Sequence, residues 1–289
     1  GESSEKTPPP QPQPQVKGLF GLSQKMEITK KVRLSGRLEC ICGMVTAGFP
    51  AVDVGCDHGF VSIYLVQNGI CPRVLAMDVR KGPLSMAESH IEEYGLGDYI
   101  ETRLSDGLKN YSPGEAEVLI CAGMGGMLMK RILEEAGRKL SGFREMILQP
   151  QSDLYEFRKF LRESGFWVIE EKIILEDGKY YFPMKERPCP DNTAVWTSEA
   201  EKESGAGVRR AETGRESHTE LEDRFGRILL QKKEPLLVRC LTERLDLESK
   251  ILRQLSGADS GHAAQRRQEI EREIEFLKMA LDAMEISVS

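Results

Sequence analysis

Carboxylates set among glycines are the most informative chemical feature of this sequence. Residues 51–54 form a mostly apolar run that leads into a turn containing Gly55, Asp57 and Gly59. The mostly apolar residues 60–66 then predict a helix. A strand, a turn and a helix in this order place backbone N–H groups and a carboxylate at one edge of a sheet. Open α/β sheets bind nucleosides at this edge, at the carboxyl ends of their strands.

The charge of this turn favours one kind of nucleoside ligand. The pyrophosphate of a dinucleotide needs a turn with a third glycine for close approach, and Asp53 and Asp57 would repel it. S-adenosylmethionine carries a sulfonium and an α-ammonium group, so an acidic turn suits its charge. We therefore predict a site for this cofactor in which Asp53, Gly55, Cys56 and Gly59 take part. A nicotinamide oxidoreductase is the alternative, and the missing third glycine disfavours it.

Two more acidic turns follow the next two predicted strands. Asp78 ends the second strand, 23 residues after Gly55, where a carboxylate can accept hydrogen bonds from both hydroxyls of a ribose. Asp106 and Gly107 follow the third strand, where the carboxylate can accept from an adenine amino group. A helix cap or a surface turn would explain each residue alone. Together, acidic turns after three successive strands predict one nucleoside site.

The fourth and fifth predicted strands end in residues suited to a substrate base. Glycines at 123, 125 and 126 leave room for a ligand or for a base flipped from its stack. Glutamine amides at 149 and 151 can read a base edge, and tight turns are the alternative for both segments. We predict cofactor contacts at Ala122 and Gly123, and substrate contacts at Met124, Gly125, Gly126, Gln149, Pro150 and Gln151.

Alternating strands and helices must hold these turns in place. Strands are predicted over residues 51–54, 73–79, 99–104, 117–122 and 145–149, and the helices between them include 82–94 and 152–164. Repeated strand–helix units predict a parallel, Rossmann-like α/β sheet with helices on both faces. Residues 166–175 and 179–185 predict a closing hairpin, turned at 176–178, that adds an antiparallel strand at one edge.

The carboxyl-terminal part predicts two helices with apolar seams. Apolar residues recur at heptad steps from Val238 to Leu255 and from Ile270 to Met284, separated by a polar loop. We predict an antiparallel, coiled-coil hairpin, packed within one chain or between two. The predicted domains are a Pro/Gln-rich tail over 1–24, a cofactor-binding domain over 25–188, a flexible insert over 189–220 and a helical domain over 221–289.

The overall composition restricts the remaining functional classes. The net charge of −6 gives no global attraction to nucleic acid, so a nucleic-acid surface has to be local. The basic stretch 17–37 is the best candidate, and we predict substrate contacts by Arg33 and Arg37, with a solvated helix face as the alternative. No apolar run suggests a membrane helix and no secretory pattern is present, so we expect a cytoplasmic protein. The seven cysteines lack a paired zinc-binding spacing, so we expect reduced, buried thiols and no metal.

Residues 33–188 resemble the bacterial tRNA adenine-N1-methyltransferases that modify adenine 22. The resemblance continues through Phe225-Gly226 and the helices that follow. The matching motifs are Arg33-Leu34-Ser35, Asp53-Val54-Gly55, Asp57-His58-Gly59, Asn68-Gly69, Gly82-Pro83-Leu84, Asp106-Gly107-Leu108, Ala122-Gly123-Met124-Gly125-Gly126, Leu148-Gln149-Pro150 and Leu175-Glu176-Asp177-Gly178-Lys179-Tyr180. The chain departs from the family at Ser62, where Pro is usual, at Asp78, where Glu is usual, and at Gln151, where Asn is common.

The resemblance implies a class I methyltransferase that uses S-adenosylmethionine and acts on tRNA. It implies that Asp57 orients the amino group of the target adenine and offsets the positive charge of the N1-methylated ring. His58 is predicted as the second catalytic residue, which positions the same turn, with a general base and a purely structural histidine as alternatives. Because adenine N1 carries a free lone pair, proximity and orientation supply much of the rate. The alternatives are methylation of another RNA, a protein or a small molecule, and a non-catalytic binding or scaffold protein.

Overall fold

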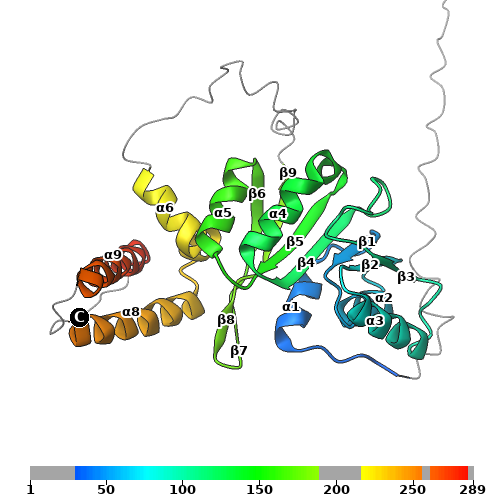
Figure 1. The fold of residues 1–289 in the computed structure, drawn as a ribbon, viewed down its shortest axis with the longest axis horizontal. Helices are drawn as coiled ribbons and strands as arrows, with labels where there is room; N and C mark the ends of the chain where they lie inside the picture. Colours follow the sequence, from blue (N-terminus) through cyan, green and yellow to red (C-terminus); the bar gives the residue numbers. More distant parts are fainter. Residues whose placement is uncertain (1–29, 189–215, 256–260, 286–289) are drawn as a thin grey trace, which may run out of the picture.

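The computed structural model describes residues 30–188, 216–255 and 261–285 (Figure 1). The predicted tail 1–24 lies outside the described residues, and so does the predicted insert up to residue 215. The described chain forms an α/β part, residues 30–188, and a helical part that begins with α6 (Figure 1).

The α/β part is built on one seven-stranded sheet with the strand order β3-β2-β1-β4-β5-β9-β6. The strands are β1 Ala51–Val54, β2 Val74–Asp78, β3 Ile100–Leu104, β4 Val118–Met124, β5 Glu145–Pro150, β6 Phe166–Glu171 and β9 Met184–Pro188. Neighbouring strands from β3 to β5 pair in parallel. The predicted Rossmann-like sheet is therefore confirmed, and the carboxyl ends of β1, β2, β3 and β4 meet at one edge.

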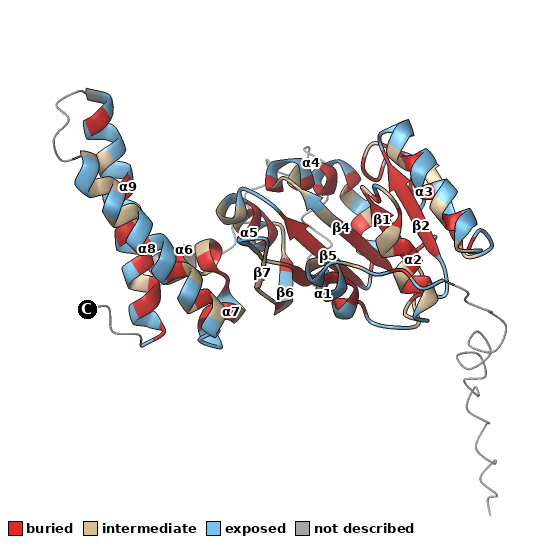
Figure 2. Ribbon diagram, turned by 90° about the horizontal axis from the view of Figure 1, so that it is seen from below, coloured by how far each residue is buried: buried red, intermediate tan, exposed pale blue. Residues whose placement is uncertain are grey.

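The sheet separates two apolar cores because helices cover both of its faces. β1, β2 and β5 are buried along their whole lengths (Figure 2), as is usual for parallel strands. One core contains residues of α1 Gly36–Met44, α2 Phe60–Gln67 and α3 Lys81–Glu93. The other contains residues of α4 Gly126–Ala136, the 3-10 helix Gly137–Gly142 and α5 Leu154–Glu163.

The predicted closing hairpin is wrong in one respect. The antiparallel strand β9 lies between β5 and β6 rather than at the edge, and it pairs with both of them in the antiparallel sense. The chain leaves the main sheet after β6 and forms a separate two-stranded hairpin, β7 Ile174–Glu176 and β8 Lys179–Tyr181. Pro183, which has no N–H to donate, stands where the chain returns to the sheet. The predicted turn is present, with left-handed φ angles of 49° at Asp177 and 74° at Gly178.

Residues 17–29 of the basic stretch lie outside the described residues, and the described part enters a helix only at its end, where Arg37 lies in the first turn of α1. Residues 30–35 are not helical. α1 begins only at Gly36, after the N-cap Ser35, whose hydroxyl accepts from the Leu38 N–H. An N-cap residue has non-helical backbone angles, so Arg33 lies before the helix, where it is exposed.

The helical part contains α6 Glu216–Phe225, α7 Arg227–Gln231, α8 Pro235–Leu255 and α9 Gly261–Ala283. α6 begins inside the segment predicted as an insert, because its sequence is mostly polar and gives a weak apolar pattern. α8 and α9 run antiparallel: Arg244 pairs with Glu273 at 2.9 Å, and Arg267 Nη2 donates to Leu255 O at 2.9 Å. Their buried leucines and isoleucines share one core, as the two apolar seams predict.

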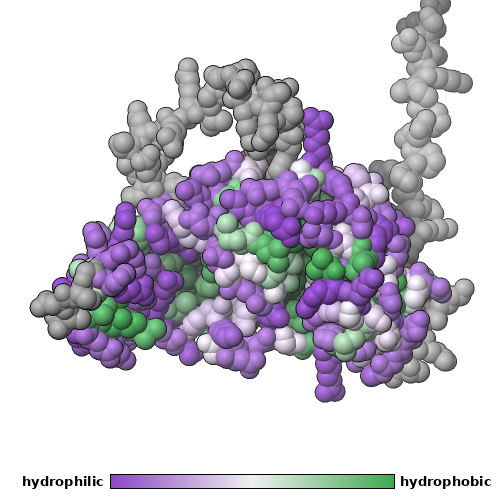
Figure 3. Space-filling view, in the orientation of Figure 1, coloured by the Kyte–Doolittle hydropathy of each residue, from purple (hydrophilic) through white to green (hydrophobic). Residues whose placement is uncertain are grey.

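The face of the molecule shown in Figure 3 is largely hydrophilic. On the face shown in Figure 3, apolar side chains gather in the hollow of the α/β part and over α8. Within the described residues, none of the helices has the length and apolarity that crossing a bilayer requires, and no group of three His, Cys, Asp or Glu side chains is arranged to hold a metal ion. Cys42, Cys56, Cys71 and Cys121 are buried, as predicted, whereas Cys40 and Cys240 are only half-buried and Cys189 lies outside the described residues.

Candidate active site

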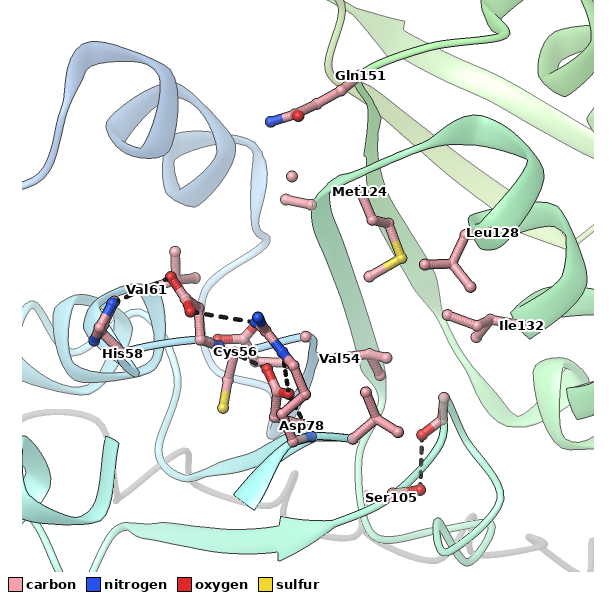
Figure 4. A pocket seen from close by; sticks show the side chains of 18 of the residues that line it. Val54, Cys56, His58, Val61, Asp78, Ser105, Met124, Leu128, Ile132 and Gln151 are labelled. Atoms are coloured by element: carbon pink, nitrogen blue, oxygen red, sulfur yellow. Dashed lines mark hydrogen bonds and ion pairs between the residues drawn. The ribbon is translucent and has the colours of Figure 1, made fainter. Parts of the chain in front are cut away.

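A cavity of about 710 Å³ opens where β1, β2 and β4 end (Figure 4). The predicted site residues that line it are Arg37, Asp53, Gly55, Cys56, Asp57, His58, Asp78, Asp106, Gly107, Ala122, Gly123, Met124 and Gln151. The three acidic turns therefore face one shared space, although they are far apart in the sequence. This convergence follows from the parallel sheet, which brings the ends of neighbouring strands together.

The turn after β1 depends on left-handed backbone conformations. Gly55, Asp57 and Gly59 have φ angles of 76°, 49° and 75°. The N–H groups of Gly55 and Cys56 both donate to the Met77 carbonyl, at 2.8 and 3.0 Å, which fixes the turn against β2. Gly59 does not line the cavity; a Cβ there would lie 3.0 Å from the Ala87 Cβ, so this glycine serves the packing of α2 on α3.

Asp53 is one of the two buried acids of the cavity, together with Asp78. Its side chain accepts a 2.8 Å hydrogen bond from the Ser62 hydroxyl, and the residue is only 4% exposed. Burial raises the pKa of Asp53 to about 6, and the Ser62 hydrogen bond opposes this effect. A cation bound nearby would replace the lost hydration and favour the ionised form. Ser62, a departure from the family pattern, thus supplies a partner for this carboxyl group.

Asp78 is held in place by backbone donors from two directions. Its Oδ2 accepts from the Asp57 N–H at 3.2 Å, and its Oδ1 accepts from the Arg80 N–H at 2.8 Å. The exposed Arg80 guanidinium lies 3.5 Å from Asp78 and 3.6 Å from Asp57. The Asp78 carboxylate is therefore fixed at the cavity wall.

Asp106 stands at the far side of the cavity, in a network of cations. Its carboxylate pairs with Lys109 at 2.5 Å and with Arg131 at 3.1 Å. These hydrogen bonds, that of Lys109 first, lower the pKa of Asp106, so the group stays ionised as an acceptor. Gly107 (φ 57°) follows; a Cβ there would lie 2.9 Å from Ile132 Cγ1, so only glycine fits.

Apolar side chains of the cavity wall were missed by sequence reasoning. Val79, 58% exposed, follows Asp78 directly, and Leu128, 43% exposed, lies one helical turn before Ile132 on α4. A flat ring would find apolar contact here. An apolar residue at the carboxyl end of a predicted strand, directly after an acid, was the available signal for Val79. The other lining residues that were not predicted are Leu38, Val54, Phe60, Val61, Arg80, Ser105 and Arg131.

The end of the cavity farthest from Ser105 holds Gln151 (Figure 4). A Cβ on Gly123 (φ 80°) would lie 3.9 Å from both Arg37 Nη1 and Gln151 Nε2. Gln149, predicted to read a base, is fully buried instead. Its Oε1 accepts from Arg37 Nη1 at 2.7 Å and its Nε2 donates to the Pro150 carbonyl at 3.0 Å. Gln149 and Pro150 therefore support the wall of the cavity and do not line it.

Other predicted substrate residues also lie outside the cavity. A Cβ on Gly126 would lie 2.5 Å from the Ser152 carbonyl, and one on Gly125 would lie 3.1 Å from the Ser152 hydroxyl. These glycines allow the start of α4 to pack against the loop after β5. Arg33 is exposed and does not line the cavity.

The predicted catalytic pair lies at the cavity rim. The Asp57 side chain is 58% exposed, and its Oδ2 lies 3.6 Å from His58 Nε2. The His58 carbonyl lies 3.0 Å from His90 Nδ1, and the His90 ring stacks on Phe60 at 4.6 Å. The backbone of this turn is therefore fixed, while the Asp57 carboxylate stays accessible.

Comparison with known proteins gives a consistent result. The family described as "Methyltransferase domain" matches residues 34–184. The tRNA (adenine(22)-N(1))-methyltransferase of Bacillus subtilis is 29% identical over 253 residues, which cover 87% of this chain and 98% of the relative. The crystal structure of the B. subtilis M1A22 tRNA methyltransferase TrmK matches with a TM-score of 0.70 at 27% identity, covering 87% of this chain and 100% of that chain. Streptococcus pneumoniae Sp1610 in complex with S-adenosyl-L-methionine matches with a TM-score of 0.68 at 27% identity, covering 86% and 100%.

The matched family segment runs from Leu34 to Met184, the first residue of β9, and contains the sheet edge described above. The cavity and its acidic turns lie inside it, and the two solved relatives extend the likeness over the helical part. The chain therefore belongs to the methyltransferase domain family.

Proposed function

We propose that this protein transfers a methyl group from S-adenosylmethionine to N1 of an adenine in tRNA, at the position equivalent to adenine 22. The observation that carries the proposal is the convergence of Asp53, Asp57, Asp78 and Asp106 on one cavity. The base and the RNA class come from the likeness to the B. subtilis enzyme. A tRNA substrate also favours a cytoplasmic enzyme.

The cavity residues fit the cofactor in charge and in shape. Asp78 faces the space with both oxygens oriented by backbone donors, which suits the hydroxyls of a ribose. Val79, Leu128 and Ile132 offer apolar walls for the adenine ring, and ionised Asp106 is an acceptor for its amino group. Asp53 is a buried carboxyl whose ionisation a cationic ligand would favour. When bound, S-adenosylmethionine supplies an electrophilic methyl group.

The remaining chemistry is assigned to the rim of the cavity. The exposed Asp57 carboxylate accepts from the amino group of the target adenine and offsets the positive charge that the ring gains on methylation. His58, 3.6 Å from Asp57, limits the orientations of that carboxylate. No strong base is required, because adenine N1 already carries a lone pair. The protein therefore acts mainly by orientation and electrostatics.

The substrate enters at the end of the cavity where Arg37 and Gln151 flank Gly123. Arg37 meets a phosphate or a base-edge acceptor of the flipped nucleotide, and exposed Arg33 lies outside the cavity as a second phosphate contact. The antiparallel hairpin of α8 and α9, which we interpret as a coiled coil, binds the body of the tRNA. These assignments place base reading and RNA-backbone binding at different parts of the chain.

Tritium transfer from labelled cofactor to unmodified tRNA transcripts tests the proposal. Label should enter the RNA and appear as 1-methyladenosine on nucleoside analysis, and replacing the target adenine with guanine should abolish it. Label in the guanine-substituted transcript would shift the target to another base. Absence of label in any tRNA, together with label in protein or small molecules, would overturn the tRNA assignment.

A further inference from the structure

The β7–β8 hairpin carries the matching motif of residues 175–180, to which the proposed function gives no role. The structure shows that this hairpin contacts two separate parts of the molecule. Glu176 and Tyr181 contact Arg37 at the cavity, and Tyr180 contacts α8 of the helical part. In Figure 1 the hairpin projects beside α1, toward the side where α8 lies.

The Glu176 carboxylate contacts both the backbone and the side chain of Arg37. Glu176 Oε1 accepts from the Arg37 backbone N–H at 3.0 Å, and Glu176 Oε2 lies 3.8 Å from Arg37 Nε. Both side chains are mostly buried, at 22% and 18% exposure. The Arg37 N–H belongs to the first turn of α1, where a carboxylate is favourable.

Two further contacts complete the setting of the Arg37 guanidinium. Its Nη1 donates to Gln149 Oε1 at 2.7 Å, and its central carbon lies 5.2 Å from the centre of the Tyr181 ring. Among the described residues, none accepts a hydrogen bond from Nη2 of Arg37. The guanidinium is therefore fixed by its neighbours while one nitrogen remains for a ligand in the cavity that Arg37 lines.

The other face of the hairpin joins it to α8. The Tyr180 hydroxyl donates to Glu243 Oε2 at 2.7 Å, and Arg239 Nε donates to Glu243 Oε1 at 2.8 Å. Tyr180 and Tyr181 are adjacent in one strand, so their side chains point to opposite faces. One short hairpin thus links the helical part to the substrate end of the cavity.

We propose that Glu176 is a positioning residue, which orients the Arg37 guanidinium toward an acceptor on the substrate nucleotide. Tyr180 couples this orientation to α8 through its hydrogen bond with Glu243. The inference rests on the proposed function, because it takes Arg37 as a substrate contact. Arg37 is the group that touches the substrate, and Glu176 acts through it. Glu176 and Tyr180 therefore affect tRNA use without affecting the cofactor.

A double-mutant cycle tests the first part. Arg37→Ala and Glu176→Ala should each lower kcat/KM for tRNA by about tenfold or more, mainly through KM, as expected for a charge-assisted hydrogen bond. If Glu176 acts through Arg37, the double variant should be no worse than Arg37→Ala. Glu176→Gln, which keeps an acceptor for the Arg37 N–H, should be less impaired than Glu176→Ala. Asp177→Asn is the matched control, since it alters the neighbouring acid and asparagine tolerates its left-handed φ.

The outcomes separate this inference from the proposed function. Independent, multiplicative effects of the two substitutions would show that Glu176 only supports α1, which would overturn the positioning role. An unchanged KM in Glu176→Ala, with an active wild type, would do the same. A wild type that methylates no tRNA would overturn the proposed function and this inference with it. Cofactor affinity, measured by calorimetry, should stay within about twofold of the wild type in every variant.

The link to α8 has its own variant. Tyr180→Phe removes only the hydroxyl that donates to Glu243 and keeps the ring. It should raise KM for tRNA by about threefold with kcat and cofactor affinity unchanged, in line with loss of one hydrogen bond. A KM equal to that of the wild type would remove α8 from the proposal.

Discussion

The backbone N–H of Asp57 donates a 3.2 Å hydrogen bond to Oδ2 of Asp78. This bond joins the turn after β1 to the end of β2. It therefore fixes the backbone of the proposed catalytic residue relative to the side chain of the proposed ribose acceptor. Asp78 therefore holds the turn and also lines the cavity that we propose for the cofactor.

Asp78→Asn should weaken cofactor binding much more than tRNA binding. The amide keeps one acceptor oxygen but loses the charge and the second acceptor, so a ribose can no longer be held by two charge-assisted bonds. We expect a loss of about tenfold to a hundredfold in affinity for S-adenosylmethionine. Calorimetry measures it, with the exposed Asp98→Asn as control. Equal affinity in Asp78→Asn and the control would exclude Asp78 as the ribose acceptor.

Asp57→Asn is the sharper test of the catalytic carboxylate. Asp57 has a φ of 49°, so alanine would add backbone strain to the loss of charge, whereas asparagine tolerates this conformation. We expect kcat to fall by about a hundredfold, the order of effect seen when an electrostatic group at a reacting centre is removed. Cofactor affinity should change little. Wild-type turnover in single-turnover assays would remove Asp57 from the mechanism.

The parallel sheet and the meeting of its acidic turns followed from the sequence. Asp57, Asp78 and Asp106 each end or follow a predicted strand, and neighbouring parallel strands end at one edge, so their convergence required only the strand order. The strand order near the edge was harder to predict. β9 enters between β5 and β6 because the chain leaves the sheet at β7 and returns after Pro183, and a local turn pattern does not show such a detour.

The glycines and Gln149 show a second limit of sequence reasoning. Gly59, Gly125 and Gly126 were assigned to ligands, but their missing Cβ atoms make room for Ala87 and for Ser152 of other elements. Such contacts join residues far apart in sequence and leave no local pattern. Gln149 was assigned to the substrate, yet its amide is used by Arg37 and Pro150. These residues are occupied by contacts with other parts of the protein and do not face the cavity. A sequence predicts which residues are buried only where apolar residues recur with a regular helix or strand period.

Asp53 predicts a pH dependence of cofactor binding. Its pKa is raised from 3.8 to about 6 in the folded protein. Between these pH values the folded state therefore binds more protons than the unfolded state. As a result, the free energy of unfolding falls as pH rises through that window, by on the order of 3 kcal/mol. A bound cation favours the ionised form, so affinity for S-adenosylmethionine should rise from about pH 5 to about pH 7.

Asp53→Asn should flatten this pH profile, because the amide does not titrate. His58→Gln is the control, since it changes another polar side chain that lines the cavity and leaves Asp53 in place. The measurement is the dissociation constant across the range in each variant. A pH profile that persists unchanged in Asp53→Asn would show that Asp53 does not cause the dependence.

Gly226→Ala should destabilise the junction between the two parts of the chain. Gly226 has a φ of 91°, and a Cβ there would lie 2.5 Å from Oε2 of Glu171. That carboxylate cannot move aside easily, because it is buried and accepts a 2.8 Å hydrogen bond from Arg158 Nε. Arg158 is itself held in place, since its Nη1 donates to the Arg224 carbonyl at 2.9 Å.

Overpacking and a strained φ at Gly226→Ala together predict a loss of roughly 2 to 4 kcal/mol in the free energy of unfolding. Urea unfolding measures this loss. The control is Gly43→Ala, where a Cβ meets nothing within 4 Å and the helix should gain slightly in stability. If both variants unfold at the wild-type urea midpoint, the contact between Gly226 and Glu171 does not hold the helical part against the sheet.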